Sequence, residues 1–272
     1  MIEMLTGLDD LEEPVAEEQE EQNGRRPGVP FEVLLERFQR KMEGIPPEYH
    51  AAMGWLYVYR QLQRERKALA NRANQFSEGK RVFWRTVLPG PTATPMADLL
   101  ASSIDPIMKA EEMAGRQVAK LMLPSSWHQQ VAVQAAGGVG ISREGGAITS
   151  AKLMWAYGSA SRFRTFGCMV RYSRLAPENG TAPKPERGKV LRYNPSAWQA
   201  LYDLSESWLR MPDCQWRQMW DNWKAVYGQE HPGYPKGRVH NMARRRVLRE
   251  FLRDLYDLWL LWEAAQGAAR VA

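Results

Sequence analysis

The sequence contains few of the residues that covalent or metal frameworks require. Its 272 residues include two cysteines, Cys168 and Cys214, with no CxxC or HxxxH spacing near either of them. Isolated thiols of this kind exclude a disulfide framework and a cysteine-based zinc site, and they suit a reducing compartment. The four histidines are scattered along the chain and predict no metal site.

Long apolar runs are missing as well. No stretch of about eighteen apolar residues occurs, and the amino terminus has no charged-then-apolar leader, so we expect no membrane span, no secretory signal and a cytoplasmic location. The P-loop, the Rossmann fingerprint and the GxSxG elbow are also absent, so the sequence predicts no cofactor.

Charge of one sign dominates outside the amino terminus. Residues 1–22 hold nine aspartates and glutamates and no lysine or arginine, and removing them leaves 37 basic and 22 acidic residues, a net charge of +15. A basic body with an acidic tail predicts a polyanionic partner. A solubilising surface on an ordinary enzyme would give the same balance of charge.

The spacing of apolar residues is helical, and strict alternation is almost absent, which predicts an all-α fold. We expect an acidic disordered leader (1–29), a helical, coiled-coil segment (30–123) and a second helical domain (124–266). The leader is either solvated or folds back on the basic body as a mimic of nucleic acid. The expected helices are 31–43, 49–76, 96–123 with an interruption at Asp105-Pro106, 124–136, 147–157, 164–173, 196–210, 213–227 and 236–264.

The long helix over 49–76 changes from aromatic-rich to strongly charged along its length. Its second half places Arg60, Arg64 and Lys67 around a seam of leucine and alanine. Such a helix is a coiled-coil arm that joins two copies of the chain, a basic face across a phosphate backbone, or an ordinary solvated face.

Eleven tryptophans invite comparison with the stacking platforms that bind single-stranded nucleic acid. Most of them fall on the apolar faces of expected helices, so core packing is the better interpretation. These core tryptophans are Trp198, Trp208, Trp216, Trp220, Trp223, Trp259 and Trp262.

A glycine turn, Gly137–Gly140, separates two apolar stretches near the middle of the chain. Its outline matches a helix-hairpin-helix, in which free N–H groups at the start of the second helix contact one phosphate without reading bases. Arg143 follows closely enough to add a charge-assisted contact. The alternative is that the turn is only a packing corner.

Residues 131–177, VAVQAAGGVGISREGGAITSAKLMWAYGSASRFRTFGCMVRYSRLAP, resemble the C-terminal half of the insertion-sequence one-ten transposase family and its relatives one-sixteen and nine-oh-two. The family has a helix-hairpin-helix, a "GD-x-x-RF" step, a short helix and a "YxGLxP" segment. The counterparts here are Gly137–Gly140, Gly158 to Arg162-Phe163, residues 165–173, and Tyr172 through Leu175 and Pro177. A basic loop, two helices and an arginine-rich last helix follow in the same order, so the resemblance covers about residues 50–262.

Two departures from the family bear on activity. The resemblance implies an RNase H-like domain with four metal-holding carboxylates, and too few residues precede the long helix to contain it. It also implies a serine nucleophile just after the proline, where this chain has Thr181 as the nearest hydroxyl. Threonine attacks only if a base activates it. Mg²⁺ is therefore expected only if a partner supplies a nuclease domain.

The sequence thus predicts a DNA-binding protein derived from a transposase, with strand-transfer activity reduced or lost, that forms homo-oligomers through the coiled coil. One alternative is an active recombinase working with a guide RNA or partner subunit, and another is a structural helical accessory protein. A structured RNA is a second expected ligand. The candidate nucleic-acid-binding residues are Gly138, Gly140, Arg143, Arg162, Arg164, Arg174, Lys184, Arg187, Lys189, Arg192, Lys236, Arg238, Arg244, Arg245 and Arg246.

Overall fold

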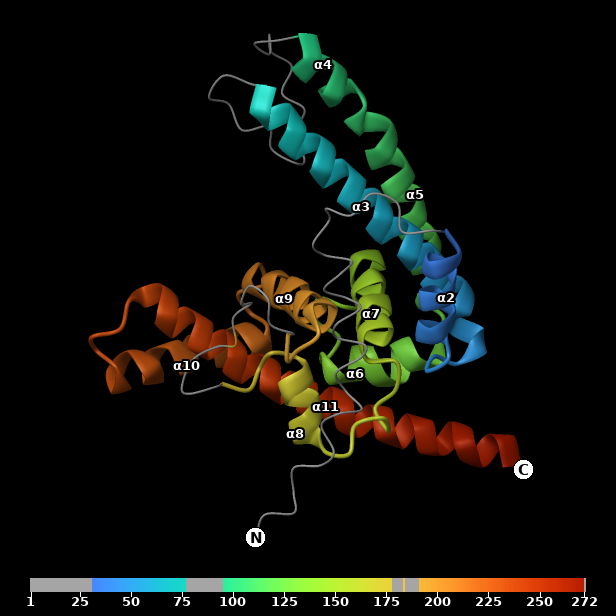
Figure 1. The fold of residues 1–272 in the computed structure, drawn as a ribbon. Coiled ribbons are helices and arrows are strands. Elements are labelled where there is room, and N and C mark those ends of the chain that lie inside the picture. The colour runs from blue at the N-terminus through green and yellow to red at the C-terminus, as the bar shows by residue number, and fades with distance from the viewer. Residues whose placement is uncertain (1–30, 77–94, 178–182, 184–190, 272) are drawn as a thin grey trace.

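The computed structural model describes residues 31–76, 95–177, 183 and 191–271, and all regular structure within these ranges is helical (Figure 1). No strand occurs among them, which confirms the predicted all-α class. None of the described helices is both long enough and apolar enough to cross a bilayer.

An antiparallel pair of helices projects from the rest of the protein as an arm (Figure 1). The first is α3 (His50–Phe76), and the second is α5 (Ile104–Met122), which packs along it, with α4 (Pro95–Ser102) at the far end. The buried Arg66 of α3 reaches Glu111 of α5, with 2.6 Å between Nε and Oε2. The arm is therefore fastened along its length within one chain.

The arm bears on the coiled-coil prediction. Ala73, a member of the expected seam, is fully buried within the arm, because α4 and α5 cover this part of α3. The helix thus finds its partner inside the chain. Assembly of several copies remains a prediction, and residues other than this alanine would have to carry it.

The break between α4 and α5 falls two residues earlier than expected. The sequence predicts an interruption at Asp105-Pro106, whereas α4 ends at Ser102 and α5 begins at Ile104. Pro106 lies in the first turn of α5, where backbone N–H groups have no acceptor within the helix. A proline there costs the helix no hydrogen bond.

In the body, α7 (Glu144–Tyr157) packs against α9 (Pro195–Leu209), and α10 (Gln215–Glu230) packs along the long α11 (Lys236–Val271), which also contacts α9 (Figure 1). The short α8 (Phe166–Tyr172) lies on α11. At the base of the arm are α2 (Phe31–Met42) and the turn η2 (Pro47–Tyr49). Several helix starts differ from expectation: α7 begins at Glu144, three residues early, and α8 and α10 begin two residues late. Residues 124–136 contain a π-helical turn η3 (His128–Ala132) and a short α6 (Val133–Ala135).

Tryptophans fill the core, as predicted for most of them. Trp208, Trp216, Trp220, Trp259 and Trp262 are buried, and Trp127 joins them with no exposed surface. The ring of Trp208 stacks on Trp216 at 5.0 Å between centroids. Trp198 and Trp223 are half-buried at the edge of the core. Large rings of this kind bury much apolar area and hold the helices in one arrangement.

Candidate nucleic-acid interface

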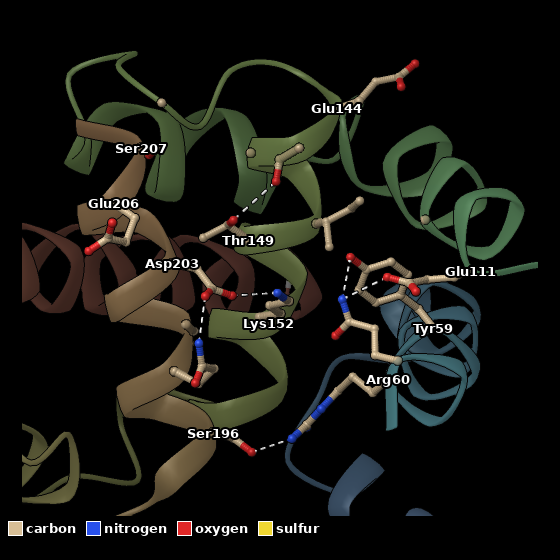
Figure 2. A pocket seen from close by; sticks show the side chains of 18 of the residues that line it. Tyr59, Arg60, Glu111, Glu144, Thr149, Lys152, Ser196, Asp203, Glu206 and Ser207 are labelled. Atoms are coloured by element: carbon tan, nitrogen blue, oxygen red, sulfur yellow. Dashed lines mark hydrogen bonds and ion pairs between the residues drawn. The ribbon is translucent and has the colours of Figure 1, made fainter. Parts of the chain in front are cut away.

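A large groove runs between the arm and the body. Residues of α3 and α5 form one wall, α9 forms the opposite wall, and α7 with the glycine turn before it forms the floor (Figure 2). The groove has a volume of about 2570 Å³. Small-molecule sites usually measure about 300–1,000 Å³, so this groove has room for a polymer.

Polar contacts join one wall to the other and one wall to the floor, as Figure 2 shows. Arg60 of α3 donates to the Ser196 hydroxyl of α9 at 2.6 Å. Lys152 of α7 forms an ion pair with Asp203 of α9, with 2.7 Å between Nζ and Oδ2. Because these contacts bridge separate helices, they fix the width of the groove before any ligand arrives.

Positive charge prevails in the groove. Ten arginines and lysines line it against six aspartates and glutamates. Four of the acidic side chains are already neutralised in ion pairs, and these are Glu111 with Arg66, Glu112 with Arg116, Asp203 with Lys152, and Glu206 with Arg244. The surplus cations therefore set the sign of the field inside the groove.

Four exposed cations are spread around the rim. Lys67 belongs to α3, Lys109 to α5, Arg143 to the end of the glycine turn, and Arg210 to the end of α9. None of them forms an ion pair with a carboxylate in the described ranges. Cations placed on opposite walls can contact both sides of a polyanion that lies between them.

The glycine turn has two different surroundings. Gly138 and Gly140 both have positive φ angles, +74° and +75°. A Cβ on Gly138 would meet nothing within 4 Å, whereas a Cβ on Gly140 would lie 2.7 Å from the Ser207 hydroxyl. Indole N–H groups of Trp208 and Trp216 donate to the turn carbonyls of Val139 and Ala136. The turn is thus seated on the body, with Gly138 on its open side.

The first turn of α7 opens into the groove. Its N-cap, Arg143, has an extended backbone, and no side chain caps the helix. Residues 142–145 are exposed and line the groove. Figure 2 shows Glu144 pointing away from Thr149 and Lys152 on the floor. The free N–H groups and the positive end of the helix dipole therefore add to the charge of the rim cations.

The aromatic side chains at the groove have guanidinium or ammonium groups against their rings. Lys152 lies 5.8 Å from the ring centroid of Tyr59, and Arg174 lies 4.8 Å from that of Tyr193. Trp198 has both Arg174 and Arg245 nearby, at 5.5 and 5.6 Å. Rings with these neighbours present less open surface for stacking on unpaired bases.

The structure brings only some of the predicted residues together. Gly138, Gly140, Arg143 and Arg174 line the groove. Arg162 and Arg164 lie beyond the opposite end of α7, about 20 Å from its first turn at 1.5 Å per residue. Arg192 is exposed next to α9, and Lys236 and Arg238 are exposed at the start of α11. Lys184, Arg187, Lys189 and Thr181 lie outside the described residues.

The three consecutive arginines of α11 have internal neighbours. Arg244 is buried and pairs with Glu206 at 2.6 Å, and Arg246 pairs with Glu250 at 3.0 Å. Arg245 is half-buried beside Trp198, where burial first and the charge of Arg174 second lower its pKa to about 10. Contact of Arg244 and Arg246 with nucleic acid stays a prediction, and each has a structural role besides.

Sequence reasoning does not single out Lys109 and Arg210, because nothing in their local sequence distinguishes them from other surface cations. They join the groove only through packing of the arm and of α9. Lys67 belongs to the basic helix face that the sequence predicts, and that face does line the groove.

Two side chains with shifted pKa values lie outside the groove. Burial raises the pKa of Tyr157 and lowers that of His128, but both side chains lie in the core and not in the groove. Within the described ranges, no three His, Cys, Asp or Glu side chains are grouped so that they could hold a metal ion.

Comparison with known proteins gives no relative. No protein-family model, curated protein or solved structure matches this chain.

Proposed function

We propose that this protein binds double-stranded DNA in the groove between the arm and the body, and that it derives from the transposase family that its central segment resembles. The observation that carries the proposal is the spread of exposed cations over both walls and the floor of one polymer-sized groove. Phosphate contacts dominate the affinity of proteins for DNA.

The proposed contacts are made to the backbone. Exposed cations suited to phosphates lie on both walls, namely Lys67 and Lys109 on one wall and Arg210 on the other. The open first turn of α7 offers backbone N–H groups at the floor. Backbone contacts position a duplex without reading its sequence, so we expect weak sequence preference.

The resemblance supports DNA as the polyanion. The glycine turn occupies the place where the family has its helix-hairpin-helix, and the same turn borders the groove. A structured RNA with a similar phosphate spacing is the competing ligand, and the experiment below includes it.

The test compares two triple variants with the same reduction in positive charge. Lys67→Gln/Lys109→Gln/Arg210→Gln removes groove cations, and Arg72→Gln/Lys120→Gln/Arg171→Gln removes exposed cations that do not line the groove. Binding of a fluorescent DNA duplex is measured by anisotropy across a range of salt concentrations.

We expect the affinity of the groove triple to fall by more than about tenfold, and its salt slope to fall by about 0.9 for each phosphate that the protein no longer neutralises. The control triple should change the affinity by less than about threefold. Equal weakening in the two variants would place DNA binding outside the groove. Tighter binding of hairpin RNA than of duplex DNA would change the ligand and leave the site in place.

A structural role is the second candidate, and one observation favours it. Gly140 fits against Ser207 and Trp208 so closely that packing alone accounts for a glycine there. Under this alternative the glycine turn is only a packing corner. The purified protein would then bind duplex DNA and hairpin RNA no more tightly than any basic protein does.

A further inference from the structure

Arg174 occupies a backbone position that normally belongs to glycine. Its φ is +63°, the only positive φ at a non-glycine residue in the described ranges. It follows α8, and the N–H groups of Leu175 and Arg174 donate to Val170 and Arg171, each at 3.0 Å. This is the Schellman ending of a helix, in which the left-handed residue is usually glycine because a Cβ is disfavoured there.

Residues that are held in an unfavourable backbone conformation cluster at functional sites. The Nε of Arg174 donates to the Pro183 carbonyl at 2.9 Å. Its guanidinium lies 4.8 Å from the Tyr193 ring centroid and 5.5 Å from that of Trp198. The left-handed turn and these contacts together aim the cation at the edge of the groove, which Arg174, Tyr193 and Trp198 all line.

A second arginine reaches the same tryptophan from α11. The guanidinium of Arg245 lies 5.6 Å from the Trp198 ring centroid. Two cations from separate elements therefore meet at one indole. The two guanidiniums also interact electrostatically. Burial of Arg245 lowers its pKa to about 10, and the positive charge of Arg174 contributes to this lowering.

No described carboxylate forms an ion pair with either arginine. Two other half-buried arginines of the body have acidic partners, since Arg217 pairs with Asp221 and Arg246 with Glu250. Half-burial of two like charges costs hydration and brings repulsion, and no carboxylate in the described ranges offsets these costs. An anion that contacts both guanidiniums would offset them.

We propose that Arg174 and Arg245 form a two-arginine clamp for one backbone phosphate of the nucleic acid in the groove, with Trp198 holding the two guanidiniums in place. Planar guanidinium forks bind phosphate oxygens in pairs of hydrogen bonds, which a lysine cannot reproduce. This clamp rests on the proposed function, because the phosphate that it binds belongs to the DNA in the groove. The clamp would fix one end of the path that the DNA backbone follows along the groove.

The left-handed backbone of Arg174 allows a variant that removes the guanidinium without adding backbone strain. Glycine adopts this φ without strain, so the melting temperature of Arg174→Gly should equal or exceed that of Arg174→Lys. The lysine variant is the matched control, because it keeps both the backbone strain and the positive charge. Duplex binding should weaken about five- to tenfold in Arg174→Gly, and the salt slope should fall by about 0.9. Arg174→Lys should lie between Arg174→Gly and the wild type.

A second measurement separates the clamp from the groove. The melting temperatures of the wild type, Arg174→Gly, Arg245→Gln and the groove triple are compared in sodium phosphate and in sodium chloride of equal ionic strength. Phosphate that binds the folded state raises its melting temperature. We expect phosphate to stabilise the wild type and the groove triple but neither clamp variant.

The outcomes are distinct. Stabilisation by phosphate that disappears in both clamp variants supports the clamp, even if the wild type fails to bind DNA and the proposed function falls. No stabilisation of the wild type, or equal stabilisation of all four proteins, overturns the clamp. DNA binding that depends on the groove triple would then still uphold the proposed function.

Discussion

Two glycines two positions apart illustrate how little the residue type alone decides. Gly138 and Gly140 share the same left-handed φ, but only Gly140 is packed against α9. From sequence, both are expected to let a phosphate approach the backbone. The structure gives Gly140 a second reason to be glycine, so a substitution there cannot by itself report on DNA.

We therefore predict different consequences for alanine at the two positions. Gly140→Ala should lower the free energy of unfolding by about 2–4 kcal/mol, because a left-handed Cβ and a contact with Ser207 both oppose it. Gly138→Ala should cost about 1–2 kcal/mol from the backbone alone. Urea unfolding followed by circular dichroism measures both. Equal midpoints would show that Ser207 moves aside without cost.

The Gly138→Ala variant also tests whether the glycine turn contacts DNA. If a phosphate approaches the turn, Gly138→Ala should weaken duplex binding under conditions in which the variant is fully folded. Unchanged affinity of the folded variant would assign the turn to packing alone.

At the scale of elements, the arm depends on a nearly buried ion pair. Arg66 is 4% exposed and Glu111 12% exposed, and Glu111 accepts three hydrogen bonds, two from Arg66 and one from Gln63. The pair joins the two helices that form one wall of the groove, so the position of that wall depends on it.

Breaking this pair should be costly, and replacing it should not be. Arg66→Met leaves a poorly hydrated carboxylate and should lower the free energy of unfolding by about 3 kcal/mol. In Arg66→Met/Glu111→Leu most of that stability should be recovered, because two apolar side chains pack in place of the ions. A double-mutant cycle from urea unfolding measures the coupling. Additive effects would mean that the two side chains act independently.

The elements themselves can largely be predicted from the sequence, because a helical period is a local property. The predicted helices 196–210 and 213–227 agree within about three residues with α9 and α10. Their starts follow from local caps, in which Asn194 accepts from the Ala197 N–H and Cys214 from the Arg217 N–H.

The groove cannot be predicted in the same way, because it depends on contacts between distant parts of the chain. Arg60 and Ser196 are 136 positions apart, and no local pattern links them. The same reason explains Arg174. The sequence presents it as one cation of a basic region, while its left-handed backbone and its meeting with Arg245 exist only in the folded protein.

At the scale of the whole molecule, we predict that the purified protein binds duplex DNA without cutting or joining it, with or without Mg²⁺. Strand transfer needs an activated hydroxyl and stabilisation of the charge that develops on the phosphate. Between Arg174 and Pro195 the only serine or threonine is Thr181, whose β-branched side chain has restricted rotamers.

Supercoiled plasmid and labelled duplex, incubated with the protein and analysed on denaturing gels, test this prediction. A covalent protein–DNA adduct that disappears in Thr181→Ala would restore the recombinase alternative. Nicking that persists in Thr181→Ala would point to a different nucleophile, and it would equally contradict a pure binding protein.

The contact between Arg60 and Ser196 has a consequence for how the chain could be divided. The predicted boundary between the two helical segments lies at residues 123 and 124, and the groove has one wall on each side of it. Neither segment alone would contain a complete binding surface. The peptide link keeps the two half-sites at a high effective concentration, so halves produced as separate polypeptides would have to reassociate before either could hold a duplex.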